Sequence, residues 1–179
     1  QLIAETIADA VIEGKEVADS RGELEVKGDS IFDVDFRSSF PGKKMVAVIG
    51  SGISGLMAAK KLLENGYGVV TFEKSNDSLG VWKTFPNQET RLQSDSVIFS
   101  PVGEKPIYEH VQSNVYSSAG EVAAYFETYM DKYNLRSHIQ FGAEVLRYEN
   151  NSEEELTFDL IYKQNNEIKK SNFYSVWIR

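Results

Sequence analysis

MVAVIGSGISGLMAAKKL, residues 45–62, is the stretch of the chain that decides the expected fold. It opens with a short, continuous apolar run, MVAVI, which is typical of a parallel strand covered on both faces. Three glycines follow in the spacing G-x-G-x-x-G, and Leu56, Ala59 and Leu63 then recur at helical spacing. The stretch therefore predicts a strand, a tight turn and a helix, which the next Asn-Gly pair terminates.

Each glycine of this turn has its own mechanical role in a loop that holds a nucleotide. Gly50 permits the tight turn, Gly52 lets the backbone approach a pyrophosphate, and Gly55 allows the helix to pack closely on the strand. The helix N-terminus offers unpaired N–H groups and the positive end of its dipole to phosphate oxygens. The loop residues predicted to touch the nucleotide are Gly50, Ser51, Gly52, Ile53, Ser54 and Gly55.

A second strand, YGVVTFE, follows the helix and ends at Glu73. A carboxylate at this point can accept hydrogen bonds from both ribose hydroxyls of a nucleotide, and it repels a 2′-phosphate. The loop is therefore expected to prefer FAD or NAD to NADP. A glycine-rich turn can also be a mere connection, but strand, turn, helix, second strand and terminal acid all agree here with nucleotide binding.

The overall composition argues against several other classes of protein. Acidic residues outnumber basic ones by 27 to 19, the net charge is -8, and no basic run stands out, so nucleic acid is not an expected partner. The chain has no cysteine and 2 histidines, which leaves no disulfide framework and little for a metal site. No run of residues is apolar for long enough to predict a transmembrane segment, and the first residues given lack the basic-then-apolar layout that predicts a signal peptide. An intracellular, cytoplasmic protein is expected.

The chain is expected to divide into two parts, residues 1–44 and residues 45–179. The first part has no assigned role. It is predicted to contain an amphipathic helix within residues 2–17, a half-buried strand in IFDVDF, residues 31–36, and a connector with Ser, Pro and Gly. The second part is predicted to be an α/β, Rossmann-like domain with a parallel sheet, helices and a β-hairpin.

The second part continues beyond the glycine loop with a less regular region. Residues 74–117 form a long excursion with weak periodicity, which favours a functional role. A helix is predicted from about Ala119 to Asn134, because Ser118 and Glu121 make a capping box. HIQFG, AEVLRYEN and LTFDLIYK are typical of strands, the last two as a hairpin, and NFYSVWI predicts one more strand.

Beyond the second strand, the segment KSNDSLGVW brings Gly80 and Trp82 directly after Glu73. At this point the sequence resembles the flavin-containing monooxygenase family, especially its plant-like members, in which the strand-ending Glu is followed by a Gly-Gly-x-Trp segment that lines FAD. Leu79 takes the place of the first glycine of that pair. The tryptophan separates this resemblance from the amine oxidases, which usually carry Gly-Gly-Arg. The resemblance implies FAD contacts at Lys74, Gly80, Val81 and Trp82.

The resemblance continues through ETRLQSDSVIFS, which is similar to a family segment that passes near the flavin ring. It implies flavin contacts at Leu92 and Gln93, while Asp95 stands where the plant pattern has proline. In relatives the backbone at the position of Val145 commonly meets the adenine. The resemblance covers residues 45–174, and its most specific parts are the glycine loop, the strand-ending acid and the Gly-x-Trp segment.

Family members carry a second glycine-rich loop for NADPH, and this sequence has none. The chain is therefore expected to be the FAD-binding portion of an NADPH-dependent flavin monooxygenase, truncated before the NADPH domain. FAD is its expected cofactor, whereas NADPH belongs to the full-length parent, which would oxygenate small substrates at nitrogen or sulfur. Because the cofactor carries that chemistry, no catalytic residue is assigned, and no metal ligand is assigned either.

Two alternatives stay open. A non-catalytic, truncated remnant or interaction module that retains the fold is favoured by Leu79, Asp95 and the chain end at Arg179. A fragment of another FAD or NAD oxidoreductase is opposed by Trp82 and the ETRLQ stretch. A sheet without its returning strands would also expose an edge, which invites self-association or a partner.

Overall fold

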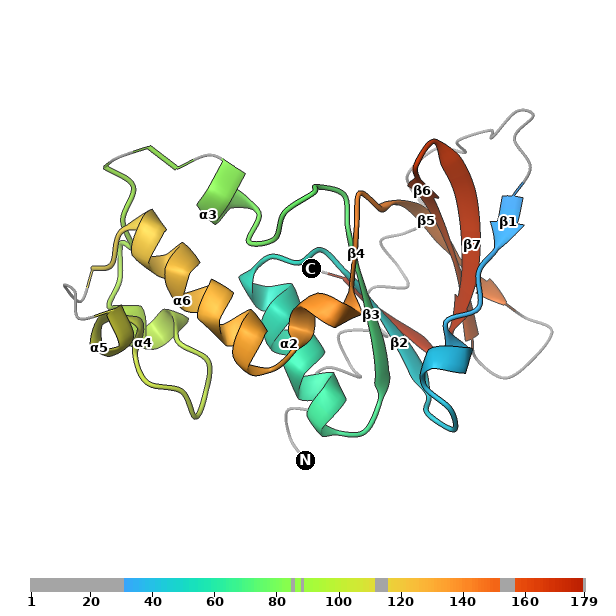
Figure 1. The fold of residues 1–179 in the computed structure, drawn as a ribbon, viewed down its shortest axis with the longest axis horizontal. Helices are drawn as coiled ribbons and strands as arrows, with labels where there is room; N and C mark the ends of the chain where they lie inside the picture. Colours follow the sequence, from blue (N-terminus) through green and yellow to red (C-terminus); the bar gives the residue numbers. More distant parts are fainter. Residues whose placement is uncertain (1–30, 85, 88, 112–115, 152–156, 179) are drawn as a thin grey trace.

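The computed structural model describes residues 31–178 except 85, 88, 112–115 and 152–156. The helix predicted within residues 2–17 lies outside the described residues. Figure 1 shows three layers, in which a central sheet lies between a group of helices and a second sheet. In this described part, we find no helix with the length and apolar character needed to cross a lipid bilayer.

The central sheet consists of β2 (Met45–Ile49), β3 (Gly68–Glu73), β4 (Ile139–Phe141) and β8 (Ser175–Ile178). Its order is β4-β3-β2-β8, and all neighbouring strands run parallel. Helix α2 (Ile53–Glu64) connects β2 to β3 and completes the predicted βαβ unit. Gly66, with a φ of 84°, then turns the chain after the helix, as the Asn-Gly pair predicts.

Alternate residues of β2 face the two outer layers, which explains the uninterrupted apolar run of this strand. Val46 and Val48 pack with Ala59 of α2 in one buried cluster. Met45 and Ala47 belong to another cluster, which lies between the central sheet and the aromatic side chains of the second sheet. The strand that leads into the glycine loop is therefore buried on both faces, which gives the loop a rigid support.

The second sheet consists of β1 (Ile31–Asp33), β5 (Glu144–Asn151), β6 (Thr157–Gln164) and β7 (Glu167–Phe173), in the order β1-β7-β6-β5. β5 and β6 pair antiparallel, which confirms the predicted hairpin. β6 and β7 are joined by Asn165 and Asn166, which have φ values of 54° and 62°. Positive φ at both residues is what a tight two-residue hairpin turn requires, and asparagine tolerates it.

The prediction of one strand in NFYSVWI is wrong, because the chain changes sheets within it. Phe173 ends β7 against β6, whereas Ser175 begins β8 against β2. Tyr174 lies between them, and its amide N–H donates to the Met45 carbonyl oxygen at 2.8 Å. Phe173 and Val176 are both buried in the core between the two sheets, so one apolar run serves two strands.

The strand predicted in IFDVDF is shorter and more exposed than expected. Only Ile31–Asp33 form β1, which runs parallel to β7 at the edge of the second sheet with all three residues exposed. The side chain of this segment that packs against the core is Phe36, whose ring centroid lies 6.0 Å from that of Phe72. A side chain beyond the strand end, and not the strand itself, therefore joins this segment to the core.

The long excursion after β3 contains three short helices, α3 (Val81–Thr84), α4 (Ser96–Phe99) and α5 (Ile107–Val111). In Figure 1 they lie around α6 (Ala119–Lys132), which a short 3₁₀ turn, η3 (Leu135–His138), follows. The predicted capping box is confirmed, because the Glu121 amide donates to Ser118 Oγ and the Ser118 amide donates to Glu121 Oε2 at 2.7 Å.

The loop between α4 and α5 is fixed to α6 through Glu104. The Glu104 carboxylate accepts hydrogen bonds from Lys132 Nζ at 2.8 and 3.0 Å, and another from the Tyr133 hydroxyl. Burial raises the pKa of this carboxyl, but the hydrogen bonds outweigh burial and lower the pKa below its ordinary value of 4.5.

Glu104→Gln is expected to remove an acid-sensitive part of the stability. A carboxyl whose pKa is lowered by folding stabilises the fold above its unfolded pKa, and this contribution disappears as the pH falls through the folded pKa. The variant should melt about 2–4 °C below wild type at neutral pH, and the difference should shrink below pH 4.5. Thermal melts of both proteins across this range check it, and a difference that stays constant with pH would contradict it.

Candidate functional site

The glycine loop lies where β2 ends and α2 begins, with Gly50 held by a hydrogen bond from its amide to the Phe72 carbonyl oxygen at 2.8 Å. Gly50 has a φ of 91°, a conformation that glycine adopts without steric cost. A methyl group added at Gly52 would meet no atom within 4 Å, so the space above this residue is open. A methyl group at Gly55 would instead overlap the Gly50 carbonyl oxygen, because helix and loop touch there.

The N-terminus of α2 is available to an anion. Gly52 is its N-cap residue, and no side chain caps this helix end. The first backbone N–H groups of a helix have no acceptor inside the helix, and they lie at the positive end of its dipole. Uncapped donors below an open space are the arrangement that binds a phosphate group.

Glu73 lies beside the loop at the end of β3 and is only 7% exposed. Its Oε2 accepts hydrogen bonds from the Ser51 amide at 2.8 Å and the Ser51 hydroxyl at 3.0 Å, and its Oε1 accepts one from the Ser75 amide at 2.9 Å. A carboxylate has about four acceptor positions, so capacity remains for a hydroxyl group of a ligand. These three bonds fix the direction in which the carboxylate points.

Ser51 has a different role from the one its place in the loop suggests. The residue is fully buried, and both its amide and its hydroxyl donate to Glu73 instead of facing the open space above Gly52. Its carbonyl oxygen accepts from the Leu79 amide at 3.0 Å, which ties the loop to the segment after β3. Ser75 was not singled out by the sequence, and no local pattern marks it as a partner of Glu73.

The segment after β3 bends through two successive residues with positive φ, Leu79 at 75° and Gly80 at 49°. Leu79 occupies the position at which the resemblance places a glycine, and a non-glycine residue with this backbone is strained by roughly 1–2 kcal/mol. Its side chain is 1% exposed in the core around α6, and that burial offsets the strain. Trp82 is half-buried and lies edge-on to Phe99, with ring centroids 6.2 Å apart.

The other predicted contact residues are more scattered. Leu92 is buried in the core around α6, whereas Lys74, Val81 and Gln93 are exposed. Val145 is half-buried near the start of β5, and the preceding Ala143 amide donates to the Glu73 carbonyl oxygen at 2.9 Å. The start of β5 and Glu73, the candidate acceptor for a ribose, therefore lie close together.

Three further observations concern these residues and their surroundings. Asp95, which stands in place of a proline, caps α4 by accepting a hydrogen bond from the Val97 amide at 2.9 Å. A cavity of about 500 Å³, lined in part by Arg37 and Lys44, includes Met45, at the opposite end of β2 from the glycine loop. Within the described residues, no group of His, Asp and Glu side chains could hold a metal ion.

Comparison with known proteins identifies the family. The sequence profile of the flavin-binding monooxygenase-like family matches residues 43–178. The chain belongs to this family. The flavin-binding monooxygenase-like match contains every residue of the candidate site described above, from the glycine loop to the start of β5.

Curated relatives come from animals and plants. Flavin-containing monooxygenase 5 of Rattus norvegicus is 38% identical over 111 residues, which cover 58% of this chain and 20% of the rat protein. Probable flavin-containing monooxygenase 1 of Arabidopsis thaliana is 33% identical over 101 residues, which cover 56% of this chain and 18% of the plant protein. The chain thus spans about a fifth of the length of these two relatives.

Solved structures share the fold. The S-allyl-L-cysteine S-oxygenase from Allium sativum superposes with a TM-score of 0.66 and 18% identity, covering 76% of this chain and 36% of that one. An oxidized steroid monooxygenase bound to NADP superposes with a TM-score of 0.60 and 25% identity, covering 70% of this chain and 24% of that one. The layered α/β arrangement of this chain is therefore the Rossmann-like arrangement of known monooxygenases.

Proposed function

We propose that this chain binds FAD and is the cofactor-binding portion of an NADPH-dependent flavin monooxygenase. The observation that carries the proposal is the uncapped N-terminus of α2 below the open space at Gly52, with the buried carboxylate of Glu73 beside it. Membership of the flavin-binding monooxygenase-like family supports the choice of a flavin nucleotide. The solved steroid monooxygenase that holds NADP supports NADPH as the reductant of the complete protein.

The residues on either side of the loop fit the parts of FAD. The backbone at Gly52 and the first amides of α2 would hold the pyrophosphate, and Glu73 would accept from the ribose of the adenosine part. The segment Gly80–Trp82 and Gln93 would face the flavin end, and the backbone at Val145 would face the adenine. Bound FAD supplies the redox chemistry, while the chain binds it, orients it and excludes water from it.

The complete protein is proposed to oxygenate small substrates at nitrogen or sulfur. This part of the proposal rests on the family and on monooxygenases among the structural neighbours. The cytoplasmic location and the self-association at an open sheet edge, both expected from the sequence, stay predictions. β8 and β4 form the two edges of the central sheet in the described residues, and they are where such an association would take place.

A titration with FAD tests the proposal, with Glu73→Gln as the informative variant. Wild type is expected to bind FAD saturably and to gain about 2.7 kcal/mol of stability at a hundredfold excess of FAD over Kd. Glu73→Gln loses a charged acceptor for the ribose, so its Kd for FAD should rise by about 10- to 100-fold. Flavin fluorescence anisotropy and thermal melts measure both effects.

Glu64→Gln is the matched control, because Glu64 lies at the far end of α2 and pairs there with Lys60 at 2.8 Å. Its Kd for FAD should equal that of wild type. A folded wild-type chain that shows no change in melting temperature with FAD would overturn the proposal, and a non-catalytic remnant of the fold would then be the better interpretation.

A further inference from the structure

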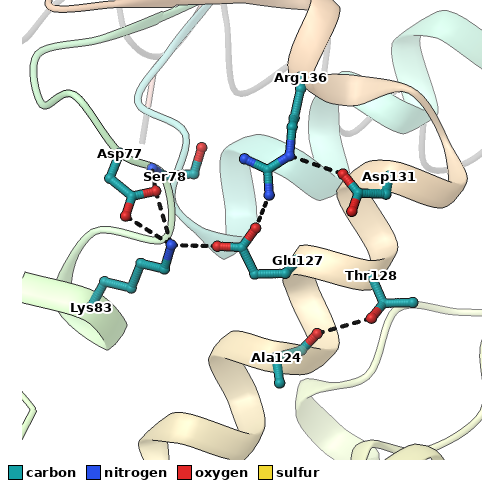
Figure 2. Close-up of polar contacts among 8 residues, drawn as sticks. All are labelled: Asp77, Ser78, Lys83, Ala124, Glu127, Thr128, Asp131 and Arg136. Atoms are coloured by element: carbon teal, nitrogen blue, oxygen red, sulfur yellow. Dashed lines mark hydrogen bonds and ion pairs between the residues drawn. The ribbon is translucent and has the colours of Figure 1, made fainter.

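A chain of opposite charges joins the segment after β3 to α6 and η3 (Figure 2). Lys83 Nζ lies 2.8 Å from Asp77 Oδ2 and also pairs with Glu127 of α6. Glu127 in turn pairs with Arg136 of η3, whose Nε lies 2.9 Å from Asp131 Oδ1. Through its ion pair with Glu127, Lys83 therefore connects the segment that carries Gly80 and Trp82 to α6.

The same segment is held on its other side by the glycine loop. The Leu79 amide donates to the Ser51 carbonyl oxygen at 3.0 Å, and Ser51 also holds Glu73. The hydrogen bond on the Leu79 side and the ion pairs of Lys83 thus lie at opposite ends of the segment that bends through Gly80. The direction of this segment relative to the open space at Gly52 depends on both ends.

Local structure alone does not hold this segment in place. α3 has 4 residues, and a helix of that length is not stable by itself in water. The left-handed backbone of Leu79 is strained, which costs free energy. Val81 is 63% exposed, so its side chain contributes little packing. The burial of Leu79 in the core around α6 and its hydrogen bond to Ser51 hold one end of the segment, and beyond Gly80 it is held by the packing of Trp82, including its contact with Phe99, and by the ion pairs of Lys83.

The ion pairs of Lys83 are partly shielded from water, so they are stronger than fully exposed pairs would be. The side chains of Lys83 and Glu127 are 32% and 25% exposed, so salt screens them less than it screens a fully exposed pair. The hydrogen bond from Lys83 also lowers the pKa of the Asp77 carboxyl below its ordinary value. Asp77 itself is fixed by the Ser78 amide, which donates to its Oδ1 at 2.8 Å.

We propose that Lys83 is a positioning residue, whose pairs with Asp77 and Glu127 hold the Gly80–Trp82 segment beside the glycine loop and thereby set the affinity for FAD. This inference rests on the proposed function and assigns a residue that positions the segment expected to contact FAD. In this inference Lys83 acts through the backbone of its neighbours and not through a contact with the cofactor. Without the pairs, FAD has to order the segment when it binds, and the ordering cost weakens binding.

The test compares Lys83→Met, Glu127→Gln and the double variant with wild type. Each single variant is expected to raise the Kd for FAD about two- to fivefold, the range for a partly exposed ion pair. The double variant should raise it little further, because both changes break the same Lys83–Glu127 pair, which is the one of these pairs that connects the segment to α6. Lys83→Arg keeps the charge and should restore most of the affinity. In a Trp177→Phe background, the remaining Trp82 reports on the segment, and Lys83→Met should lower its fluorescence anisotropy before FAD is added.

Lys132→Met is the matched control, because it removes another ion pair of α6, that with Glu104, without touching the segment 77–83. It should lower the melting temperature slightly and leave the Kd for FAD unchanged. If Lys83→Met behaves like this control, the ion pair is merely structural and the inference is wrong. If wild type itself fails to bind FAD, the proposed function fails as well, and the wild-type titration tells these two results apart.

Discussion

Gly55→Ala is expected to lower the free energy of unfolding by about 3 kcal/mol, the upper end of the usual range for overpacking. The added methyl group would overlap the Gly50 carbonyl oxygen, and it would come within 3.6 Å of the Val48 side chain. Because the nearest atom belongs to the backbone, relief requires a shift of α2 relative to β2. A chain of this size should then melt roughly 6–12 °C below wild type.

Gly120→Ala is the control for this prediction. Gly120 lies in the first turn of α6, and a methyl group there would meet no atom within 4 Å. Alanine is a better helix former than glycine, so this variant should keep or slightly raise the stability. Urea unfolding of both variants decides the matter. A Gly55→Ala protein as stable as wild type would show that α2 and the loop do not touch as closely as described.

Gly52→Asp is expected to strengthen the fold and destroy the cofactor site. Gly52 has φ of -66° and ψ of 173°, which any residue adopts, and it is the uncapped N-cap of α2. Aspartate at an N-cap accepts a hydrogen bond from the first turn and interacts favourably with the helix dipole, which together contribute up to about 1 kcal/mol. The same carboxylate would occupy the place of the pyrophosphate, so the Kd for FAD should rise at least about a hundredfold.

Gly52→Ala separates the two effects of this substitution. It adds bulk without charge and without a capping acceptor, so it should lower the FAD affinity less than Gly52→Asp and should not raise the melting temperature. Thermal melts without FAD and anisotropy titrations with FAD measure stability and binding separately. A Gly52→Asp protein that still binds FAD like wild type would rule out a phosphate position above Gly52.

The strand, glycine loop, helix and second strand could be predicted because each rests on a local pattern. The run at β2, the helical spacing in α2 and the Asn-Gly stop all act over a few neighbouring residues, and the structure confirms them. β7 was missed, although Asn165 and Asn166 are a turn signal. The change of sheet at Tyr174 has no such signal. Phe173 and Val176 are buried in the same core, so the pattern of apolar residues is the same whether they belong to one strand or to two.

In the candidate site, too, the features that depend on local sequence could be predicted, and those that depend on tertiary contacts could not. The openness at Gly52 and the closeness at Gly55 agree with what the spacing of the glycines predicts. The bonds between Ser51 and Glu73, and the ion pairs of Lys83, join residues from different elements. Tertiary packing alone brings such partners together, so no window of sequence contains the information.

The pairing of β8 with β2 has a consequence for how the protein is made. β2 and β3 are adjacent in sequence apart from one helix, whereas the partner on the other side of β2 arrives at Ser175–Ile178, long after them. Synthesis proceeds from the N-terminal end, so β2, the glycine loop and β3 emerge from the ribosome while one edge of β2 still lacks its partner. Contacts of such long sequence separation slow folding, which makes the half-finished sheet the stage at which chaperones would be needed most.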